Sequence, residues 1–422
     1  MNEKRKFHYA WVIMIALIFL KVGAGATSCM TGNFITPVVN ELGCKVNQFT
    51  LFLSIDAVGM SIFYVPAAKI INSKRKLGIT IGIATLCEVL GIAMMYTYKS
   101  VWGFYLSGFL IGSAGAFTGY VAVPVIINMW FKKKAGTVLG IIIAIGNASN
   151  VIFGLLSARF ITLYGWRMAY LLVALLGFVL MVPEVFFLLK TPEEVGCRPY
   201  GEEETVEADK NETVTVNSNQ WGLTRKEAFG QAAFWLAWLT CLCYSYGTAI
   251  PGYIATCTTM ELGYSTEFGA RVHTFVNIGA ILCSVILGRL NDRFGVRSGC
   301  LWGALFSFIG YNVIILGFNN QILLFVGAFL VGLANSMYAV QAPLLAKEIV
   351  GTKHYSDIWS VMMVANSLIG GGLLFTVGYF YDYGHTYKGA FIMGSLLYIF
   401  AMLVAFTAIR LSKKYKPVRE AN

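Results

Sequence analysis

The chain has 422 residues, of which 57% are hydrophobic and only 13% are charged. About one quarter of the residues in an ordinary soluble protein are charged, so most of this chain is not expected to face water. The net charge of +11 does not indicate nucleic-acid binding, because the basic residues lie in short clusters between long apolar runs. This arrangement is typical of an integral membrane protein.

Twelve apolar stretches are long enough to cross a bilayer as helices, which takes about 20 residues. Helices are expected because a spanning backbone must satisfy its own hydrogen bonds. The first stretch is too long for the apolar part of a signal peptide and is expected to be retained. The predicted spans are Tyr9–Pro37, Gln48–Ile71, Leu77–Tyr96, Val101–Trp130, Ala135–Leu163, Met168–Leu189, Phe229–Cys257, Gly269–Leu290, Val296–Phe318, Ile322–Ala346, Ile358–Phe380 and Ala390–Leu411. The fold class is therefore predicted to be an all-α membrane protein.

Basic clusters mark alternate connections between these spans. Cytoplasmic loops carry an excess of lysine and arginine, so the pattern predicts an inner (plasma) membrane protein with both termini in the cytoplasm. The clusters are Lys4–Lys6, Lys74–Lys76, Lys132–Lys134, Arg289–Arg297, Lys347 with Lys353, and Lys413–Lys416.

One polar connection divides the chain into two halves of six spans each. It contains the acidic stretch EEETVEADKNETVTVNSNQ (Glu202–Gln220), which is predicted to be a flexible cytoplasmic linker. The predicted domains are a helix bundle over residues 1–190, a linker over 191–228 and a second bundle over 229–422. Paired halves are the usual construction of secondary transporters, and a weak repeat relates LYGWRMAY (Leu163–Tyr170) to DYGHTYKGAF (Asp382–Phe391).

The stretch GRLNDRFGVRSG (Gly288–Gly299) is the most conspicuous polar motif. Gly288 allows close helix approach and Gly295 suits a turn, while Asp292 and Arg293 offer charges for pairing. Placed between predicted spans eight and nine, the motif resembles the loop signature of the major facilitator superfamily, and we expect these four residues to act in gating. In the corresponding first-half loop INSKRKLG (Ile71–Gly78), no aspartate stands where the signature has one.

Four further stretches narrow the resemblance. They occur in the order NMWFKKKAGTVLGI (Asn128–Ile141), YGWRMAY (Tyr164–Tyr170), TPEEVGCRPYGEEE (Thr191–Glu204) and AAFWLAW (Ala232–Trp238). Together they resemble the oxalate:formate antiporter and monocarboxylate porter branch of that superfamily. The resemblance covers nearly the whole chain. It implies twelve helices that alternate access for a small organic anion, with a proton or in exchange.

The chain departs from that branch at two positions. Ser284 and Met363 stand where anion-carrying members can have arginine and lysine. A dicarboxylate would need two strong cationic partners in a low-dielectric cavity, so oxalate is not expected as the substrate.

Ionisable residues within spans are costly and are therefore functional candidates. Lys21 either binds a substrate carboxylate or pairs structurally with Asp56 or Glu88. Asp56 and His273 are candidates for proton coupling, and a packing role for His273 is an equal alternative. Glu88 is expected to be structural, because the resemblance places the third span at the periphery of the fold.

Spans one, four, seven and ten line the cavity in the fold that the resemblance implies. Near their middle they offer Tyr120, Tyr244, Tyr246, Asn335 and Tyr338, and ordinary packing is the alternative for each aromatic ring. Phenols with few charges suit a monocarboxylate that has an apolar or aromatic body. Gly108, Gly112, Gly115 and Gly119 recur along the fourth span and predict close helix packing.

These observations predict a secondary transporter of a small monocarboxylate, coupled to a proton. An exchanger or exporter of a bulkier amphipathic or aromatic acid is the alternative within transport. A transporter-like sensor and a membrane enzyme are disfavoured, since the linker is too short for a signalling domain and no cluster of metal-binding spacing is present in the sequence. The expected partners are a small organic acid, protons or a counter-anion, and the lipid bilayer. A monomer without cofactor, metal or nucleic acid is expected.

Overall fold

The computed structural model describes residues 8–28, 33–73, 76–201, 221–384 and 386–415. The described residues are almost entirely helical, and their only strand-like pairings are two isolated bridges. The all-α prediction is confirmed. The predictions for Lys4–Lys6, Lys74, Arg75, Lys416 and the acidic linker stretch concern residues outside the described part.

The chain forms two compact units, which are described separately. The first comprises Met1–Val138, Ile145–Val216 and Met363–Ser367, and the second comprises Leu139–Ala144, Asn217–Met362 and Leu368–Asn422. The domain boundaries predicted from the sequence do not assign Leu139–Ala144 to the second unit or Met363–Ser367 to the first, as the structure does.

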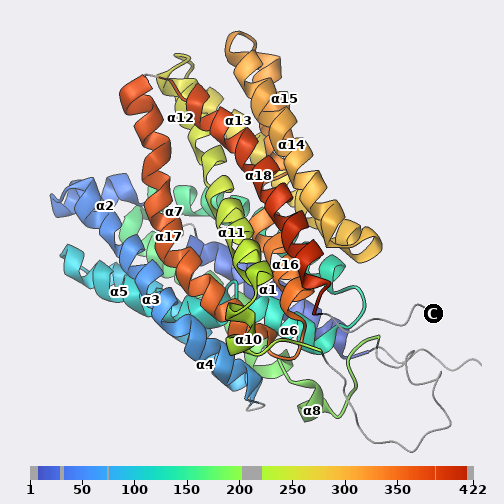
Figure 1. Ribbon diagram of the computed structural model, residues 1–422. Helices are drawn as coiled ribbons and strands as arrows, with labels where there is room; N and C mark the ends of the chain where they lie inside the picture. The colour runs from blue at the N-terminus through green and yellow to red at the C-terminus, as the bar shows by residue number, and fades with distance from the viewer. Residues whose placement is uncertain (1–7, 29–32, 74–75, 202–220, 385, 416–422) are drawn as a thin grey trace, which may run out of the picture. The chain divides into compact units, whose positions relative to one another are not determined.

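The first unit contains the helices of the amino-terminal half (Figure 1). They are α1 (Ala10–Ser28), α2 (Ile35–Leu42), α3 (Val46–Asn72), α4 (Leu77–Met94), α5 (Val101–Thr118), α6 (Ala122–Trp130), α7 (Ala135–Leu188) and α8 (Pro192–Val195). Helix α7 covers the fifth and sixth predicted spans. It is broken at Gly165, whose φ of 77° and ψ of 164° are not helical. Positive φ suits glycine, which has no side chain to clash there.

The second unit contains most of the helices of the carboxy-terminal half. They are α10 (Arg225–Phe229), α11 (Ala232–Gly247), α12 (Tyr253–Met260), α13 (Thr266–Phe294), α14 (Val296–Leu316), α15 (Gln321–Gly332), α16 (Ala342–Val350), α17 (Tyr355–Gly384) and α18 (Lys388–Ser412). Short 3-10 turns at Ile250–Gly252 and Gly317–Asn319 and a π turn at Met337–Gln341 connect some of them.

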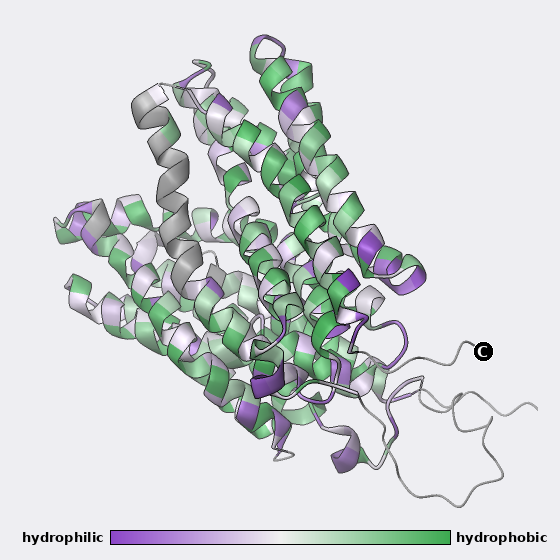
Figure 2. Ribbon diagram, viewed as in Figure 1, coloured by the Kyte–Doolittle hydropathy of each residue, from purple (hydrophilic) through white to green (hydrophobic). Residues whose placement is uncertain are grey.

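Many of these helices suit a bilayer. Among the described residues, nine helices are long and apolar enough to cross a membrane, and Ala10–Ala26 is a shorter apolar helix. Figure 2 shows hydrophobic residues along most of the helix lengths and hydrophilic ones gathered at helix ends and connections, as at α8 and α10. The protein is therefore a multi-pass membrane protein, while the count of twelve spans stays a prediction.

Helices α3 and α5 approach closely through glycine, as the sequence predicted. A Cβ atom added at Gly112 would lie 2.0 Å from the backbone oxygen of Asp56, and one at Gly108 would lie 2.5 Å from that of Phe52. Small residues at such contacts let helix backbones pack tightly in a membrane. An aromatic core that includes Phe104 and Trp166 fills the neighbouring part of the same unit.

Each unit ties the start of its last long helical segment to a carboxylate from an earlier connection. In the first unit, Glu41 accepts hydrogen bonds from the Trp166 indole N–H and from Arg167 Nε, at 3.0 Å for the latter. In the second unit, Glu261 accepts hydrogen bonds from the Thr386 hydroxyl and from the Tyr387 backbone N–H, at 2.7 Å for the latter. The receiving stretches are the two that the sequence indicated as a repeat.

The connection between the two halves is described at both of its ends, up to residue 201 and from residue 221. Each end forms a backbone hydrogen bond to its own unit. The Tyr200 carbonyl accepts a 2.9 Å hydrogen bond from the Lys132 backbone N–H, in the first unit. The Trp221 carbonyl accepts a 2.9 Å bond from the Thr352 backbone N–H, in the second unit. Lys132 follows α6 and Thr352 follows α16, so each docking point lies just after a corresponding helix.

Candidate substrate site

Three of the spanning segments are interrupted in their middle. The segment Val101–Trp130 breaks at residues 119–121 between α5 and α6, where Gly119 has φ −95° and ψ −133°. The segment Ala232–Met260 breaks between α11 and α12, and the segment Gln321–Val350 breaks between α15 and α16, next to the π turn. Non-helical backbone at membrane depth is tolerated where it is buried in protein or lines a cavity, and π turns are frequent at functional sites.

The residues predicted to line the cavity lie at these interruptions. Tyr120 lies in the first break, Tyr244 and Tyr246 end α11 just before the second, and Asn335 and Tyr338 lie in the third. The sequence placed these residues near the middle of spans but did not locate the breaks. Gly119 and Pro251 are the signals at the first two.

In the first unit, Lys21 and Tyr120 come together. The Lys21 ammonium Nζ lies 5.5 Å from the centroid of the Tyr120 ring, a distance at which a cation is attracted to a ring face. Lys21 is half-buried, and Tyr120 keeps 43% of its surface accessible. The ring is therefore available to a ligand that binds beside the ammonium.

The packing of α1 against α7 holds Lys21 in place. A Cβ atom at Gly25 would lie 2.3 Å from the Ser149 hydroxyl, and that hydroxyl donates a 2.7 Å hydrogen bond to the Val22 carbonyl. Gly146 faces the Lys21 stem, since its added Cβ would lie 3.5 Å from the Lys21 Cβ. The lysine is thus supported on one side by small residues of α7.

Two carboxylates belong to the same cluster. Glu88 is only 4% exposed, and its Oε2 accepts a 3.0 Å hydrogen bond from the Thr118 hydroxyl. Glu88 belongs to the same unit as Lys21 and Asp56. Asp56 is half-buried on α3. Glu88 was expected to be structural, and its hydrogen bond to Thr118 at the end of α5 is compatible with that role.

In the second unit, the two tyrosines of α11 are enclosed by packing. Tyr244 is 1% exposed and its ring centroid lies 5.7 Å from that of Tyr398. Tyr246 is 6% exposed, and its hydroxyl donates to the Met393 sulfur at 3.6 Å. In this conformation both rings stabilise the interior of the unit. The packing alternative for these two rings is therefore well supported.

Asn335 and Tyr338 are half-buried at the interruption beside α15. The Asn335 side-chain oxygen is buried and has no hydrogen-bond partner among the described residues. Next to it, the Ser284 hydroxyl donates a 2.7 Å hydrogen bond to the Ser336 hydroxyl, which donates to the Ala280 carbonyl at 2.9 Å. The Ser284 hydroxyl also lies 2.9 Å from that carbonyl. Ser284 stands where the resemblance would allow an arginine, and the structure has a neutral pair of hydroxyl groups there.

His273 lies on α13 in the second unit, half-buried and next to the backbone of Pro251. It therefore belongs to a different unit from Lys21, Glu88 and Asp56.

The polar motif Gly288–Gly299 covers the end of α13 and the start of α14, and it has the expected turn. Gly295 has φ 78° and ψ 170°, which separates α13 from α14, and Asp292 and Arg293 are exposed. The sequence missed Asn291, whose side-chain N–H donates 2.7 Å hydrogen bonds to Gln341 Oε1 and to the Leu287 carbonyl.

Gln341 completes the link between three elements of the second unit. It ends the π turn and donates from Nε2 to the Val296 carbonyl at 2.7 Å. The signal for Asn291 was its place inside the motif, directly before Asp292.

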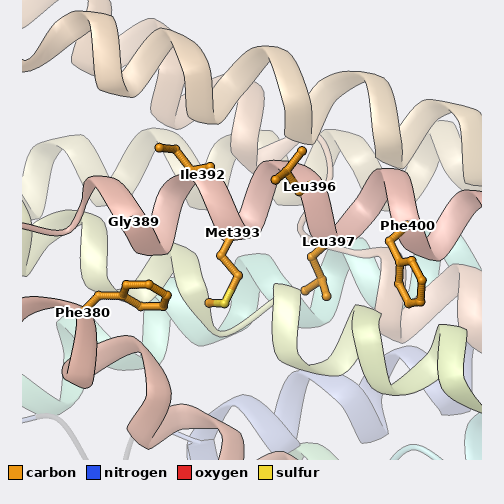
Figure 3. Close-up of a pocket in the computed structure, with 7 residues that line it drawn as sticks. All are labelled: Phe380, Gly389, Ile392, Met393, Leu396, Leu397 and Phe400. Atoms are coloured by element: carbon orange, nitrogen blue, oxygen red, sulfur yellow. The ribbon is translucent and has the colours of Figure 1, made fainter.

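A cavity of about 460 Å³ lies elsewhere, along α18 of the second unit. Figure 3 shows the residues that line it, which are Phe380 from α17 and Gly389, Ile392, Met393, Leu396, Leu397 and Phe400 from α18. All are apolar, so this cavity offers no counter-charge to an anion. No group of three potential metal-binding side chains occurs among the described residues.

Comparison with known proteins places the chain in a family. The profile of the Major Facilitator Superfamily matches residues 15–283 and 261–421. A putative glycerol-3-phosphate transporter of Arabidopsis thaliana is 24% identical over 62% of this chain and 53% of its own length. Sugar phosphate exchanger 3 of Mus musculus is 24% identical over 50% of this chain and 47% of its own length. The chain therefore spans about half the length of these curated relatives.

The solved structure of the proton:xylose symporter XylE, bound to 6-bromo-6-deoxy-D-glucose, has the same fold. It superposes with a TM-score of 0.69 at 14% identity, over 97% of this chain and 96% of the other. The names of the two relatives refer to organic phosphates and not to oxalate, formate or a monocarboxylate, so they do not support the narrower branch inferred from motifs. The family profile covers most of the chain, and the protein belongs to the Major Facilitator Superfamily.

Proposed function

We propose that this secondary transporter carries a small organic anion with a single negative charge by alternating access. The observation that carries the proposal is Lys21. It is the only lysine or arginine near the middle of the predicted spans, and it lies beside an accessible aromatic ring. An anion at Lys21 would gain a charge-assisted hydrogen bond, and an apolar or aromatic body would cover the Tyr120 face.

A monocarboxylate fits this site better than a dianion does. A single ammonium balances one carboxylate, whereas a second negative charge would stay unpaired in a low-dielectric site. Transport of a bulkier aromatic acid, in exchange or in export, fits the same two groups.

An organic phosphate is the second candidate. It is favoured by the relatives, whose names refer to glycerol-3-phosphate and sugar phosphate. Lys21 would then bind the phosphate group, and binding would strengthen as the phosphate monoester dianion takes up one proton near a pH of about 6 and becomes a monoanion.

We place the protein in the inner (plasma) membrane, as a monomer with both termini in the cytoplasm and with Asp292, Arg293, Gly288 and Gly295 at the inward gate. The basic clusters support this orientation.

Uptake by reconstituted vesicles tests the substrate class. The panel contains labelled acetate, lactate, benzoate, glycerol 3-phosphate and glucose 6-phosphate, with xylose as the neutral control. Uptake of a monocarboxylate, lost in Lys21→Gln, is the expected result. Uptake of only the two phosphates would establish the second candidate. Xylose uptake that is unaffected by Lys21→Gln would contradict the proposed function.

A further inference from the structure

One end of the second unit carries basic side chains from two parts of the chain that lie far apart in sequence. In the stretch Arg289–Arg297 the only acid is Asp292, and the stretch Phe406–Tyr415 has no acid. The basic residues are exposed and come from the end of α13, the start of α14 and the end of α18, as Arg289, Arg293, Arg297, Arg410, Lys413 and Lys414.

A stacking contact brings the two groups of cations together. Helices α14 and α18 pack against each other within the second unit (Figure 1). The Arg297 guanidinium carbon lies 5.9 Å from the centroid of the Phe406 ring, a distance at which a cation is attracted to a ring face. Phe406 and Arg410 are about one helical turn apart, so they share one face of α18. Arg297 and Arg410 therefore lie at one place on the surface of the unit.

No acid of the protein neutralises these arginines in the described part of the chain. No described residue forms an ion pair with Arg293, Arg297 or Arg410. Arg293 stacks instead on the Phe294 ring, at 5.1 Å from its centroid, and that ring is 63% exposed. The dipole of α18 favours a cation such as Arg410 near its end, but a cation in the first turn of α14 gains nothing from the dipole of that helix. Local helix electrostatics therefore does not explain Arg297.

An apolar stripe leads along α18 to these cations. Leu396, Leu403 and Arg410 follow one another at intervals of about two turns, so they lie on one face of the helix. Leu396 is 55% exposed and Leu403 is 56% exposed. The helix rises about 21 Å from Leu396 to Arg410. One leaflet contributes about 15 Å of hydrocarbon, so a stripe of this length reaches from the middle of the bilayer to the headgroup layer.

We propose that this end of the second unit is a binding site for an anionic phospholipid. The guanidinium groups of Arg297 and Arg410 hold the lipid phosphate, because their planar N–H forks match its oxygens. The acyl chains lie along Leu403 and Leu396, and Lys413 adds positive charge beside the headgroup.

The stripe is the feature that selects a lipid. A soluble phosphate would use the cations alone, whereas the exposed leucines lead an acyl chain directly to them. The basic clusters predict that this end faces the cytoplasm, where the leaflet is rich in anionic lipid. The site lies in the second unit and Lys21 in the first, so the inference does not depend on the proposed function.

Lipid binding to detergent-purified full-length protein tests the site. The probe is labelled phosphatidylglycerol, and phosphatidylcholine with the same acyl chains is the neutral control. Wild type is expected to bind phosphatidylglycerol more tightly than phosphatidylcholine, and the preference is expected to shrink as salt is added, because exposed charges are screened. Equal affinity for the two lipids would overturn the proposal.

Single variants locate the site on the surface. Arg297→Gln and Arg410→Gln are each expected to lower the affinity for phosphatidylglycerol about fivefold, the factor that one lysine or arginine contributes at an anionic surface, and to leave that for phosphatidylcholine unchanged. Both side chains are exposed, and either variant suffices if the other does not fold. Lys99→Gln and Lys388→Gln are matched controls, since they remove the same charge at exposed positions predicted to face outward. An equal loss in the controls would show attraction to net charge and overturn the site.

A competitor separates a lipid from a soluble phosphate. Glycerol 3-phosphate is added to the protein with bound phosphatidylglycerol, in wild type and in Lys21→Gln, so that phosphate bound at Lys21 does not affect the result. It is expected to displace little lipid, and Leu403→Ala is expected to weaken binding of both lipids. Displacement by glycerol 3-phosphate in both proteins, with unchanged lipid affinity in Leu403→Ala, would show a soluble phosphate site and overturn the lipid assignment.

Discussion

At the scale of single residues, the structure changes what the sequence indicated about charge. Lys21 and Tyr120 were separate candidates nearly one hundred positions apart, and only the packing of their elements shows that they lie 5.5 Å from one another. Glu88 was expected to be structural, because the resemblance places its helix at the periphery of the fold, and the structure shows that its side chain is buried. Side-chain direction around α4 decides its burial, and an all-round apolar helix gives no periodicity from which to read that direction.

The first prediction concerns Lys21. Lys21→Gln is expected to weaken binding of a transported anion by about 2–5 kcal/mol, the usual cost of removing one partner of a desolvated charge pair. Lys21→Arg is expected to retain more affinity, limited by the width of the guanidinium. Binding to detergent-purified protein, measured together with its melting temperature, checks this. Unchanged affinity with a lowered melting temperature would leave Lys21 a purely structural residue.

The second prediction concerns Glu41, which lies outside the predicted spans. Its hydrogen bonds from Trp166 and then from Arg167 lower the pKa of the Glu41 carboxyl. The folded protein therefore favours the ionised form, so the stability from this cluster is present above the unfolded pKa and is lost as pH falls through the lower folded value. Because the Glu41 side chain is 50% exposed, solvent screening keeps the effect small.

Glu41→Gln is expected to lower the melting temperature at pH 7 and to flatten its decrease between about pH 5 and pH 3. Glu267→Gln is the matched control, since the Glu267–Arg271 pair is far more exposed, at 3.8 Å. A Glu41→Gln variant with the wild-type acid profile would show that the cluster does not contribute to stability.

At the scale of elements, the interrupted helices connect sequence to site. Glycine and proline indicate the breaks at Gly119 and Pro251, because both residues disfavour a continuous helix. The break beside Asn335 begins directly after Gly332, but the same helix continues through Gly327, so a glycine alone does not locate the break. The predicted spans were continuous there, and the site roles of the polar residues within them stay predictions.

The third prediction concerns the packing of α14 against the π turn. A Cβ atom at Gly299 would lie 2.0 Å from Gln341 Oε1 and 2.8 Å from Asn291 Nδ2. Gly299→Ala is therefore expected to break the Asn291–Gln341 hydrogen bond and to destabilise the second unit by about 1–3 kcal/mol. Thermal unfolding measures this. Gly252→Ala is the control, because no atom lies within 4 Å of its added Cβ, and equal melting temperatures for the two variants would contradict the prediction.

The fourth prediction concerns Asp292, which is exposed in the last turn of α13. If this carboxylate holds the inward gate closed, Asp292→Asn is expected to slow transport while leaving expression and anion binding largely intact. The reason is that it biases a conformational equilibrium and removes no substrate contact. Initial rates in vesicles, compared with equilibrium binding, check this, and Asp292→Glu is expected to keep most of the rate. Wild-type turnover in Asp292→Asn would exclude the gating role.

At the scale of the whole molecule, composition and span length were sufficient to predict an all-α membrane protein. The motifs were sufficient to predict the superfamily. The repeat is clearer in structure than in sequence. Glu41 and Glu261 hold equivalent connections although the residues that they bind differ, since one receives an indole and a guanidinium and the other a hydroxyl and a backbone N–H. Different donors satisfy a carboxylate at a corresponding place in each unit, so a contact of this kind is present in both units although the two stretches share few residues.

The last prediction concerns orientation in the membrane. The basic clusters predict that the turn at Lys133 and the turn at Arg293 face the cytoplasm, whereas Lys99 and Lys388 face outward. All four residues are exposed in their own units, so a cysteine at each would be open to reagent. In a background with the native cysteines replaced, a membrane-impermeant maleimide added to intact cells is expected to label Lys99→Cys and Lys388→Cys. It is expected to label Lys133→Cys and Arg293→Cys only after permeabilisation. Labelling of Lys133→Cys in intact cells would reverse the orientation. It would also place the docked Tyr200 segment outside, because its carbonyl is bonded to the neighbouring Lys132.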